Sequence, residues 1–235
     1  MLCRLISNQR PSSAIEFTHT RESKKQTIRI DDNDVCDACK VAEIKHNKID
    51  WAERENELKE LCDKYRRTDG SYDCLVPGSG GKDSFYAAHK LRYKYGMNPL
   101  TVTWAPHIYT DWGWRNFQSW IGAGFDNFLH TPNKRVHRLL TRLAIENLFH
   151  PFQPFILGQK MLAPKMALLF DIPLVFYGEN EAEYGNAIAS NEQSKRDWSY
   201  FSSEDQSKIF LSGVSIKDLK NKFGLNEVDL VPYMP

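Results

Sequence analysis

Residues 77–84 have the types and spacing of a phosphate-binding loop, Pro-Gly-Ser-Gly-Gly-Lys-Asp-Ser. A short apolar run at 74–76 precedes them, and apolar residues recur at helical spacing from Lys82 onward. Strand, glycine loop and helix in this order bring backbone N–H groups to the positive end of a helix, where anions bind. Lys82 adds a positive charge, and Ser79 and Ser84 add hydroxyl donors. The segment therefore predicts a phosphate site.

Two well-known phosphate motifs do not fit this loop. A Walker A loop has four residues between its first glycine and Gly-Lys-Ser/Thr, but here Val76 takes the first position and Asp83 follows the lysine. The dinucleotide fingerprint matches Gly78 and Gly80 but fails at Asp83, where its third glycine belongs. The hexapeptide 79–84 instead resembles the pyrophosphate loop of the PP-loop ATP pyrophosphatases. An ordinary glycine-rich turn is the alternative.

Acidic residues follow a second apolar run, at 173–177. Glu179, Glu181 and Glu183 stand at alternate positions directly after it. If 173–177 is a strand of the same sheet, its carboxyl end delivers these side chains to the edge that holds the glycine loop. Carboxylates beside a phosphate site hold Mg²⁺ or accept protons. An acidic loop that only faces solvent is the alternative.

Cys36 and Cys39 form a Cys-x-x-Cys pair, which is half of a tetrahedral zinc site. Cys3 is the one other cysteine nearby, and His19 or His46 could supply a further ligand. The acidic residues before the pair lack the spacing of an EF-hand. The alternative to a structural zinc site is a pair of free thiols.

The elements that must position these groups alternate between strands and helices. Strands are predicted at 74–76, 100–104, 125–129 and 173–177, and helices at 82–95 and 134–149. This alternation is typical of an α/β fold, here a Rossmann-like parallel sheet with flanking helices. Ligands bind at the carboxyl ends of such strands, where Trp104 and His107 fall. His107 is either a ligand contact or a capping group.

Composition divides the chain into three parts: a polar segment with the cysteine pair and a linking helix at 1–66, the α/β region at 67–200, and a helical segment at 201–235. Within the α/β region, Trp112 and Arg115 could stack on a sugar ring or pack a helix onto the sheet, whereas packing is expected for Trp120. Arginines on the helix at 134–149 form a stripe that is typical of a solvated face, with a docking surface for an acidic partner or nucleotide as the alternative.

The composition argues against several classes of protein. The chain has 235 residues, 41% of them hydrophobic, which is enough for one substantial domain with a small appendage. No apolar run approaches the roughly 20 residues of a membrane span, and residues 1–10 lack the core of a signal peptide, so a cytoplasmic protein is expected. The 31 basic and 30 acidic residues are mixed, which disfavours a nucleic-acid partner. Five cysteines without a framework fit a reducing compartment.

Several separated stretches together resemble the N-acetyl sugar amidotransferase family within the PP-loop superfamily. They are residues 6–11, 36–39, 49–51, 77–84, 96–100 and 178–185. Enzymes of this family are associated with sugars of bacterial lipopolysaccharide, O-antigen and flagella. They adenylate the N-acetyl oxygen of a sugar, which can be nucleotide-linked, and ammonia then replaces that oxygen to give an acetamidino group. The resemblance implies ATP and Mg²⁺, and it implies ammonia-supplying subunits similar to the glutaminase and cyclase of imidazole glycerol phosphate synthase.

The resemblance also implies roles for individual residues. Lys82 would offset the charge of the departing pyrophosphate, and Asp83 with Glu179 would bind Mg²⁺. Glu181 or Glu183 would orient ammonia or take its proton. The ATP contacts would be Ser79, Gly80, Gly81, Lys82, Asp83, Ser84, Trp104, Gly158 and Gln159. The sugar contacts would be Trp112, Arg115, Asn180 and Tyr184.

The chain departs from the family at both ends. Family members typically carry a Cys-x-x-Cys just before the stretch at 6–11, where this chain has Cys3 alone. They also generally continue past the position of residue 235, so the C-terminal segment is expected to be truncated relative to the family. The sugar and any homo-oligomer stay open.

Two other functions compete with the amidotransferase. A PP-loop enzyme that modifies tRNA, such as a thiolase, would need a basic face and a catalytic cysteine near the loop; the balanced charge disfavours it, and Cys74 lies within a predicted strand. A nucleotide-binding subunit without turnover, acting as a scaffold for a glutaminase, is the second alternative.

Overall fold

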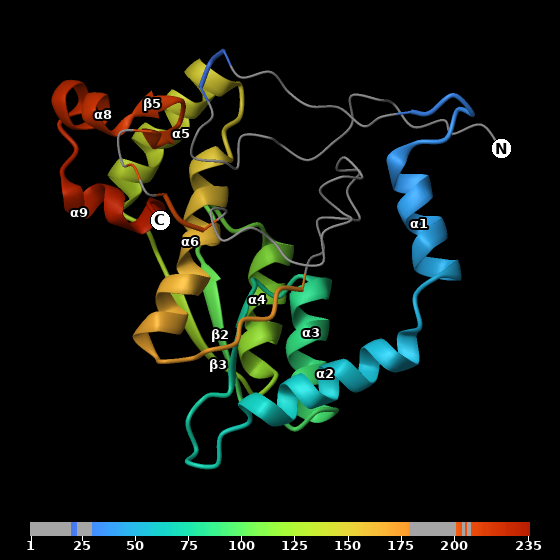
Figure 1. Cartoon of the computed structure of the whole chain (residues 1–235). Helices are drawn as coiled ribbons and strands as arrows, with labels where there is room; N and C mark the ends of the chain where they lie inside the picture. Colours follow the sequence, from blue (N-terminus) through green and yellow to red (C-terminus); the bar gives the residue numbers. More distant parts are fainter. Residues whose placement is uncertain (1–19, 23–29, 179–200, 204, 206–207) are drawn as a thin grey trace.

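The computed structural model describes residues 20–22, 30–178, 201–203, 205 and 208–235 (Figure 1). It begins with α1 (Asp37–Asn47) and α2 (Trp51–Tyr65). The central part contains β1 (Cys74–Pro77), α3 (Lys82–Tyr93), β2 (Pro99–Trp104), α4 (Asp111–Gly122), β3 (Asp126–His130), α5 (Lys134–Leu148) and α6 (Gln153–Leu169). The C-terminal part contains β4 (Phe210–Leu211), β5 (Val214–Ser215), α8 (Ile216–Phe223), α9 (Glu227–Leu230) and the 3₁₀ turn η5 (Val231–Tyr233). None of the helices in these ranges is long and apolar enough to cross a membrane.

Strands β1, β2 and β3 form a parallel sheet in that order. The segment 173–177 lies on the other side of β1. There Leu75 N–H donates to the Leu174 carbonyl and Phe176 N–H donates to the Leu75 carbonyl, both at 2.9 Å. Val175 bridges Leu75 in the parallel direction. The predicted fourth strand therefore runs in the expected direction beside β1, but its pairing is limited to this one bridge.

Alternate residues of β1 enter two separate apolar cores, and β2 contributes to one of them. Leu75, which pairs with Leu100, and Val102 belong to the core that α5 and α6 cover. Cys74 and Val76 belong to the core that α3 and α4 cover. Figure 1 shows α3 and α4 on one side of the sheet and α6 on the other. Helices thus cover both faces of a parallel sheet, as expected for the Rossmann-like α/β arrangement, and β2 is buried along its whole length.

The chain from residue 209 to 234 completes the core under α5 and α6, to which Leu219 and Tyr233 contribute buried side chains. The antiparallel hairpin β4–β5 was not predicted, because each of its strands has only two residues. Helix α8 follows its sequence signals: the Ser215 hydroxyl accepts from a backbone N–H at the start, and Gly224 ends it with a φ of +67°. The C-terminal elements therefore share a core with the sheet.

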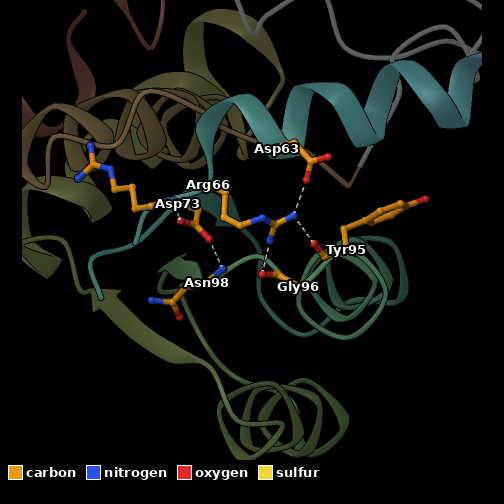
Figure 2. A network of polar contacts seen from close by, with 7 residues as sticks. Asp63, Arg66, Asp73, Tyr95, Gly96 and Asn98 are labelled. Carbon is orange, nitrogen blue, oxygen red and sulfur yellow. Dashed lines mark hydrogen bonds and ion pairs between the residues drawn. The ribbon is translucent and has the colours of Figure 1, made fainter. Parts of the chain in front are cut away.

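A polar network closes the amino end of the sheet (Figure 2). The Asp73 carboxylate, in a residue that is 3% exposed, accepts from the backbone N–H groups of Arg67 at 2.5 Å and Asn98 at 2.6 Å. The Arg66 guanidinium donates to the carbonyls of residues 95 and 96. This network ties the segments that lead into β1 and β2 to the end of α2.

Asp50 and Pro164 show how single residues act on helices α2 and α6. The Asp50 carboxylate accepts from the N–H groups of Ala52 and Glu53, so it caps α2 as its sequence indicates. Pro164 lies inside α6, where a proline ordinarily kinks or breaks a helix, but α6 is assigned as one helix from Gln153 to Leu169.

Candidate functional site

The glycine loop continues β1 and is anchored to β2. The N–H of Gly78 donates to the Val102 carbonyl at 2.9 Å, and the Thr103 hydroxyl donates to the Gly78 carbonyl at 2.6 Å. A Cβ at position 78 would lie 2.5 Å from the side chain of Ser84. Glycine therefore allows the loop to fold back onto the first turn of α3.

Gly80 and Gly81 have different surroundings. Gly80 has a φ of +85°, and a Cβ there would lie 2.2 Å from the backbone oxygen of Asn116 in α4. Both the dihedral and the close approach require glycine. Gly81 has a φ of −63°, and a Cβ there would meet no atom of the described residues within 4 Å. The space beside Gly81 is open, so a side chain at 81 would obstruct only a molecule that binds there.

The first turn of α3 presents donors to this open space. Gly81 is the N-cap and has no side chain to pair with the N–H groups of residues 82–84, which have no acceptor within the helix. The Lys82 side chain is 91% exposed and its Nζ lies 3.4 Å from the Asp83 carboxylate. The Ser84 hydroxyl donates to the Gly81 carbonyl at 3.2 Å. A helix N-terminus with an adjacent exposed cation is well suited to a phosphate group.

The end of the 173–177 segment meets the loop from the other side. A Cβ at Gly178 would lie 2.4 Å from the backbone nitrogen of Ser84 and 2.5 Å from the carbonyl carbon of Asp83. Because β2 lies on one side of β1 and 173–177 on the other, the order of strand addition reverses at β1. Open α/β sheets bind ligands at such a reversal, beyond the carboxyl ends of the strands. The glycine loop occupies this position.

The predicted acidic and substrate residues that follow Gly178 lie outside the described residues. They are Glu179, Asn180, Glu181, Glu183 and Tyr184. Their roles stay predictions. What the structure establishes is that Gly178, the last described residue before them, contacts the first turn of α3.

Trp104 and Gly158 pack against each other in the core under α6. Trp104 is 3% exposed, and a Cβ at Gly158 would lie 2.3 Å from its indole ring. The Trp104 ring also lies edge-on to Tyr233, with 5.4 Å between centroids. Gln159, the next residue on α6, is exposed. The structure does not bring Trp104 and Gly158 to the glycine loop, and a buried indole has no open face on which a nucleotide base could stack.

Helix α4 places Trp112 and Arg115 at the surface. The Arg115 guanidinium lies 5.1 Å from the centroid of the Trp112 ring, which is 71% exposed. The next residue, Asn116, supplies the backbone that Gly80 contacts. Trp120 is fully buried, as expected. The exposed pair is therefore carried by the helix that borders the loop, and its contact with a sugar stays a prediction.

The described cysteines near the sheet are unreactive. Cys62 and Cys74 are buried, and burial raises the pKa of Cys74 to about 12, which keeps its thiol protonated. Cys36 is buried and Cys39 is exposed. Within the part of the chain that the structure describes, no three His, Cys, Asp or Glu side chains form a group that could hold a metal ion. Cys3 lies outside that part, so the zinc site stays a prediction.

A pocket that the sequence did not reveal lies beyond the carboxyl ends of β2 and β3. Its volume is about 450 Å³, and its lining includes His107, Lys134, His137 and Arg138. His137 is 4% exposed. A histidine among the apolar residues of a helix ordinarily indicates a core position, so its spacing carried no signal that it faces a pocket.

Comparison with known proteins gives little further information. No family model matches the chain. An uncharacterized protein of Methanocaldococcus jannaschii is 31% identical over 84 residues, which make up 36% of this chain and 29% of that protein. The match therefore covers under a third of its length, and its description names no activity.

Proposed function

We propose that the chain binds ATP with its pyrophosphate in the glycine loop and cleaves ATP between the α and β phosphates. The observation that carries this proposal is the open space beside Gly81, which the N-terminus of α3 and Lys82 border where the strand order reverses. A phosphate in this space would accept hydrogen bonds from the first turn of α3. Lys82 would offset the charge that develops on the leaving pyrophosphate. The α/β sheet covered by helices on both faces suits a PP-loop ATPase.

The acceptor in this proposal is the N-acetyl group of a free or nucleotide-linked sugar, as the sequence resemblance implies. An amide carbonyl is a poor electrophile, and its oxygen is a poor leaving group. Transfer of AMP to that oxygen, with release of pyrophosphate, turns the oxygen into a good leaving group. Ammonia then forms the new C–N bond, AMP departs with the oxygen, and the sugar gains an acetamidino group. Glu181 or Glu183 would take the proton that ammonia loses.

Asp83 fits the part of a Mg²⁺ ligand in this scheme. Its carboxylate lies in the first turn of α3 and is 42% exposed, within reach of a cation bound to the phosphates. Carboxylates and phosphate oxygens are the ligands that Mg²⁺ prefers. When bound, the ion would supply positive charge against the phosphate oxygens. A thiolase-like reaction is less well supported, because Cys62 and Cys74 are buried.

Product analysis tests the reaction. The chain is incubated with ATP, Mg²⁺, an ammonium salt and a panel of free and nucleotide-linked N-acetyl sugars. AMP should form only with one sugar, whose mass should show that NH has replaced an oxygen. Formation of ADP would contradict cleavage between the α and β phosphates. Tight ATP binding without AMP formation would instead favour the scaffold subunit.

Two variants test whether the glycine loop is the phosphate site. Lys82→Ala should lower the rate of AMP formation by roughly 100-fold, because it removes a charge that acts on the leaving group. Gly81→Ala should weaken pyrophosphate binding, measured by calorimetry, because its methyl group would enter the open space. Lys217→Ala is the matched control: this exposed lysine also lies in the first turn of a helix, α8, but no glycine loop precedes it. Wild-type pyrophosphate binding in both loop variants would exclude the loop.

A further inference from the structure

The pocket beyond β2 and β3 lies at the same edge of the sheet as the glycine loop but on the face that α5 covers. His107 and Ile108 follow β2, Thr131 and Pro132 follow β3, and Lys134 begins α5. A volume of about 450 Å³ is within the range of small-molecule sites. The glycine loop leads instead into α3, which packs on the opposite face. The two sites are therefore separate.

His137 brings a buried polar atom to this pocket. Its Nδ1 lies 2.9 Å from the Tyr233 hydroxyl, whereas its Nε2 is buried and has no hydrogen-bond partner among the described residues. An unpaired buried polar atom is costly and ordinarily has a reason. Because His137 lines the pocket and Nδ1 is already engaged, Nε2 is the nitrogen left to pair with a bound molecule.

The hydrogen bond to Tyr233 indicates which nitrogen of His137 carries the proton. Burial raises the pKa of Tyr233, so the hydroxyl keeps its proton. Within the described residues His137 is the only hydrogen-bond partner of that hydroxyl. If the hydroxyl donates to Nδ1, its proton is paired. Burial also lowers the pKa of His137 to about 4, so the ring is neutral at pH 7. A neutral ring that accepts at Nδ1 carries its hydrogen at Nε2. His137 therefore holds an unpaired donor in the wall of the pocket.

The charged lining is also made of donors. Lys134 and Arg138 lie on the first two turns of α5, and neither has a carboxylate partner in the described part of the chain. No acidic side chain is among the lining residues. His107 stacks on His137 with 4.2 Å between ring centroids, and partial burial lowers its pKa as well. A molecule with oxyanion acceptors is therefore complementary to this lining, with its carbon body against Pro106, Ile108 and Pro132.

We propose that this pocket is a second binding site, which holds a small molecule through a phosphate or carboxylate group that accepts hydrogen bonds from His137 Nε2–H and Arg138. The proposal does not depend on the function of the glycine loop. Phosphate and carboxylate offer the same acceptor chemistry, so the probes have to separate them.

Imidazole ¹H–¹⁵N spectra of the full chain provide a local measurement, with the His137 signals assigned from a His137→Gln variant. The spectrum should show His137 with its hydrogen on Nε2. Titration with inorganic phosphate or with malonate should shift these signals, and the tighter of the two probes identifies the oxyanion class. A dissociation constant of about a millimolar or tighter is expected. A hydrogen on Nδ1, or no shift with either probe, would overturn the proposal.

Three variants complete the test. Arg138→Gln should weaken the binding of the tighter probe by roughly fivefold or more, because it removes a charge-assisted hydrogen bond. Arg135→Gln is the matched control, since Arg135 lies on the same helix, is exposed, carries the same charge and does not line the pocket. Gly81→Ala should leave the His137 response unchanged, which separates this pocket from the glycine loop. Equal weakening by the two arginine substitutions would mean that nonspecific charge attraction, and not the pocket, binds the anion.

Discussion

The two ends of the sheet differ in whether their polar groups have hydrogen-bond partners. At the amino end, the buried Asp73 carboxylate accepts from two backbone N–H groups (Figure 2). The Arg66 guanidinium beside it donates to the carbonyls of residues 95 and 96. At the carboxyl end, the first turn of α3 has an N-cap without a side chain, and the Nε2 of His137 has no partner among the described residues. Polar groups that have hydrogen-bond partners within the protein stabilise its fold, whereas donors without a partner are available to a ligand. The amino end is therefore structural, and the carboxyl end is where function is expected.

The largest effect on stability is expected at the amino end. Asp73→Ala should lower the free energy of unfolding by about 2–3 kcal/mol, because two partly buried backbone N–H groups lose their acceptor. Urea denaturation measures this change. Asp63→Ala provides the control. The Asp63 side chain is largely exposed and, among the described residues, pairs with Arg66 at 2.9 Å, so its loss should cost little. Equal losses of unfolding free energy in the two variants would contradict the structural role assigned to Asp73.

Two adjacent glycines of the loop are expected to have different roles. Gly80 is needed for the fold, whereas Gly81 borders the space proposed for the ligand. Gly80→Ala should lower the free energy of unfolding by about 2 kcal/mol, because it strains a left-handed backbone and forces a methyl group against Asn116. Gly81→Ala should change it by less than about 0.5 kcal/mol, because a less flexible unfolded chain offsets a weaker helix cap. Thermal unfolding of both variants measures the contrast. Similar losses would mean that the space beside Gly81 is not open.

The carboxyl end should also make stability depend on pH. The folded-state pKa of His137 is lowered to about 4, below its ordinary value of 6.5, so the unfolded chain takes up a proton first. The contribution of the neutral His137 ring to the free energy of unfolding is complete above pH 6.5 and is lost as the pH falls toward 4. Between pH 7 and pH 5 the loss should be about 1–2 kcal/mol.

Urea denaturation at the two pH values, compared with His137→Gln, isolates this contribution. His107 and His130 also have lowered pKa values, and both remain in the variant as a common background. The variant should therefore show a smaller loss of stability than the wild type. An unchanged pH dependence would show that the neutral His137 ring does not contribute.

Local sequence signals predicted the parts of the fold that depend on neighbouring residues. Asp50 and Ser215 cap their helices as their sequences indicate, and the run from Leu100 to Trp104 forms the central strand. The apolar run at 173–177 predicted a strand, but its pairing with β1 depends on residues a hundred positions away. Chain-distant contacts therefore limited the prediction.

The same limit applies to the sites. The place of the glycine loop between β1 and α3 could be predicted, because the strand, the glycines and the helix are consecutive in sequence. Trp104 was placed near a nucleotide because it ends a strand, yet its burial comes from Gly158 and Tyr233, far along the chain. The pocket of His137 was missed for the same reason, since its walls come from the ends of β2 and β3 and from α5.

The smallest effect should come from Arg66→Lys, which keeps the charge at the amino end but removes the planar group. A guanidinium can donate to Asp63 and to the carbonyls of residues 95 and 96 at once, whereas an ammonium cannot match this geometry. Because these acceptors are partly exposed and water can replace a lost bond, the free energy of unfolding should fall by no more than about 1 kcal/mol. Urea denaturation measures the loss, and pyrophosphate and phosphate titrations of the same variant should match the wild type. A change in either affinity would mean that the two ends of the sheet are coupled and that their roles cannot be separated.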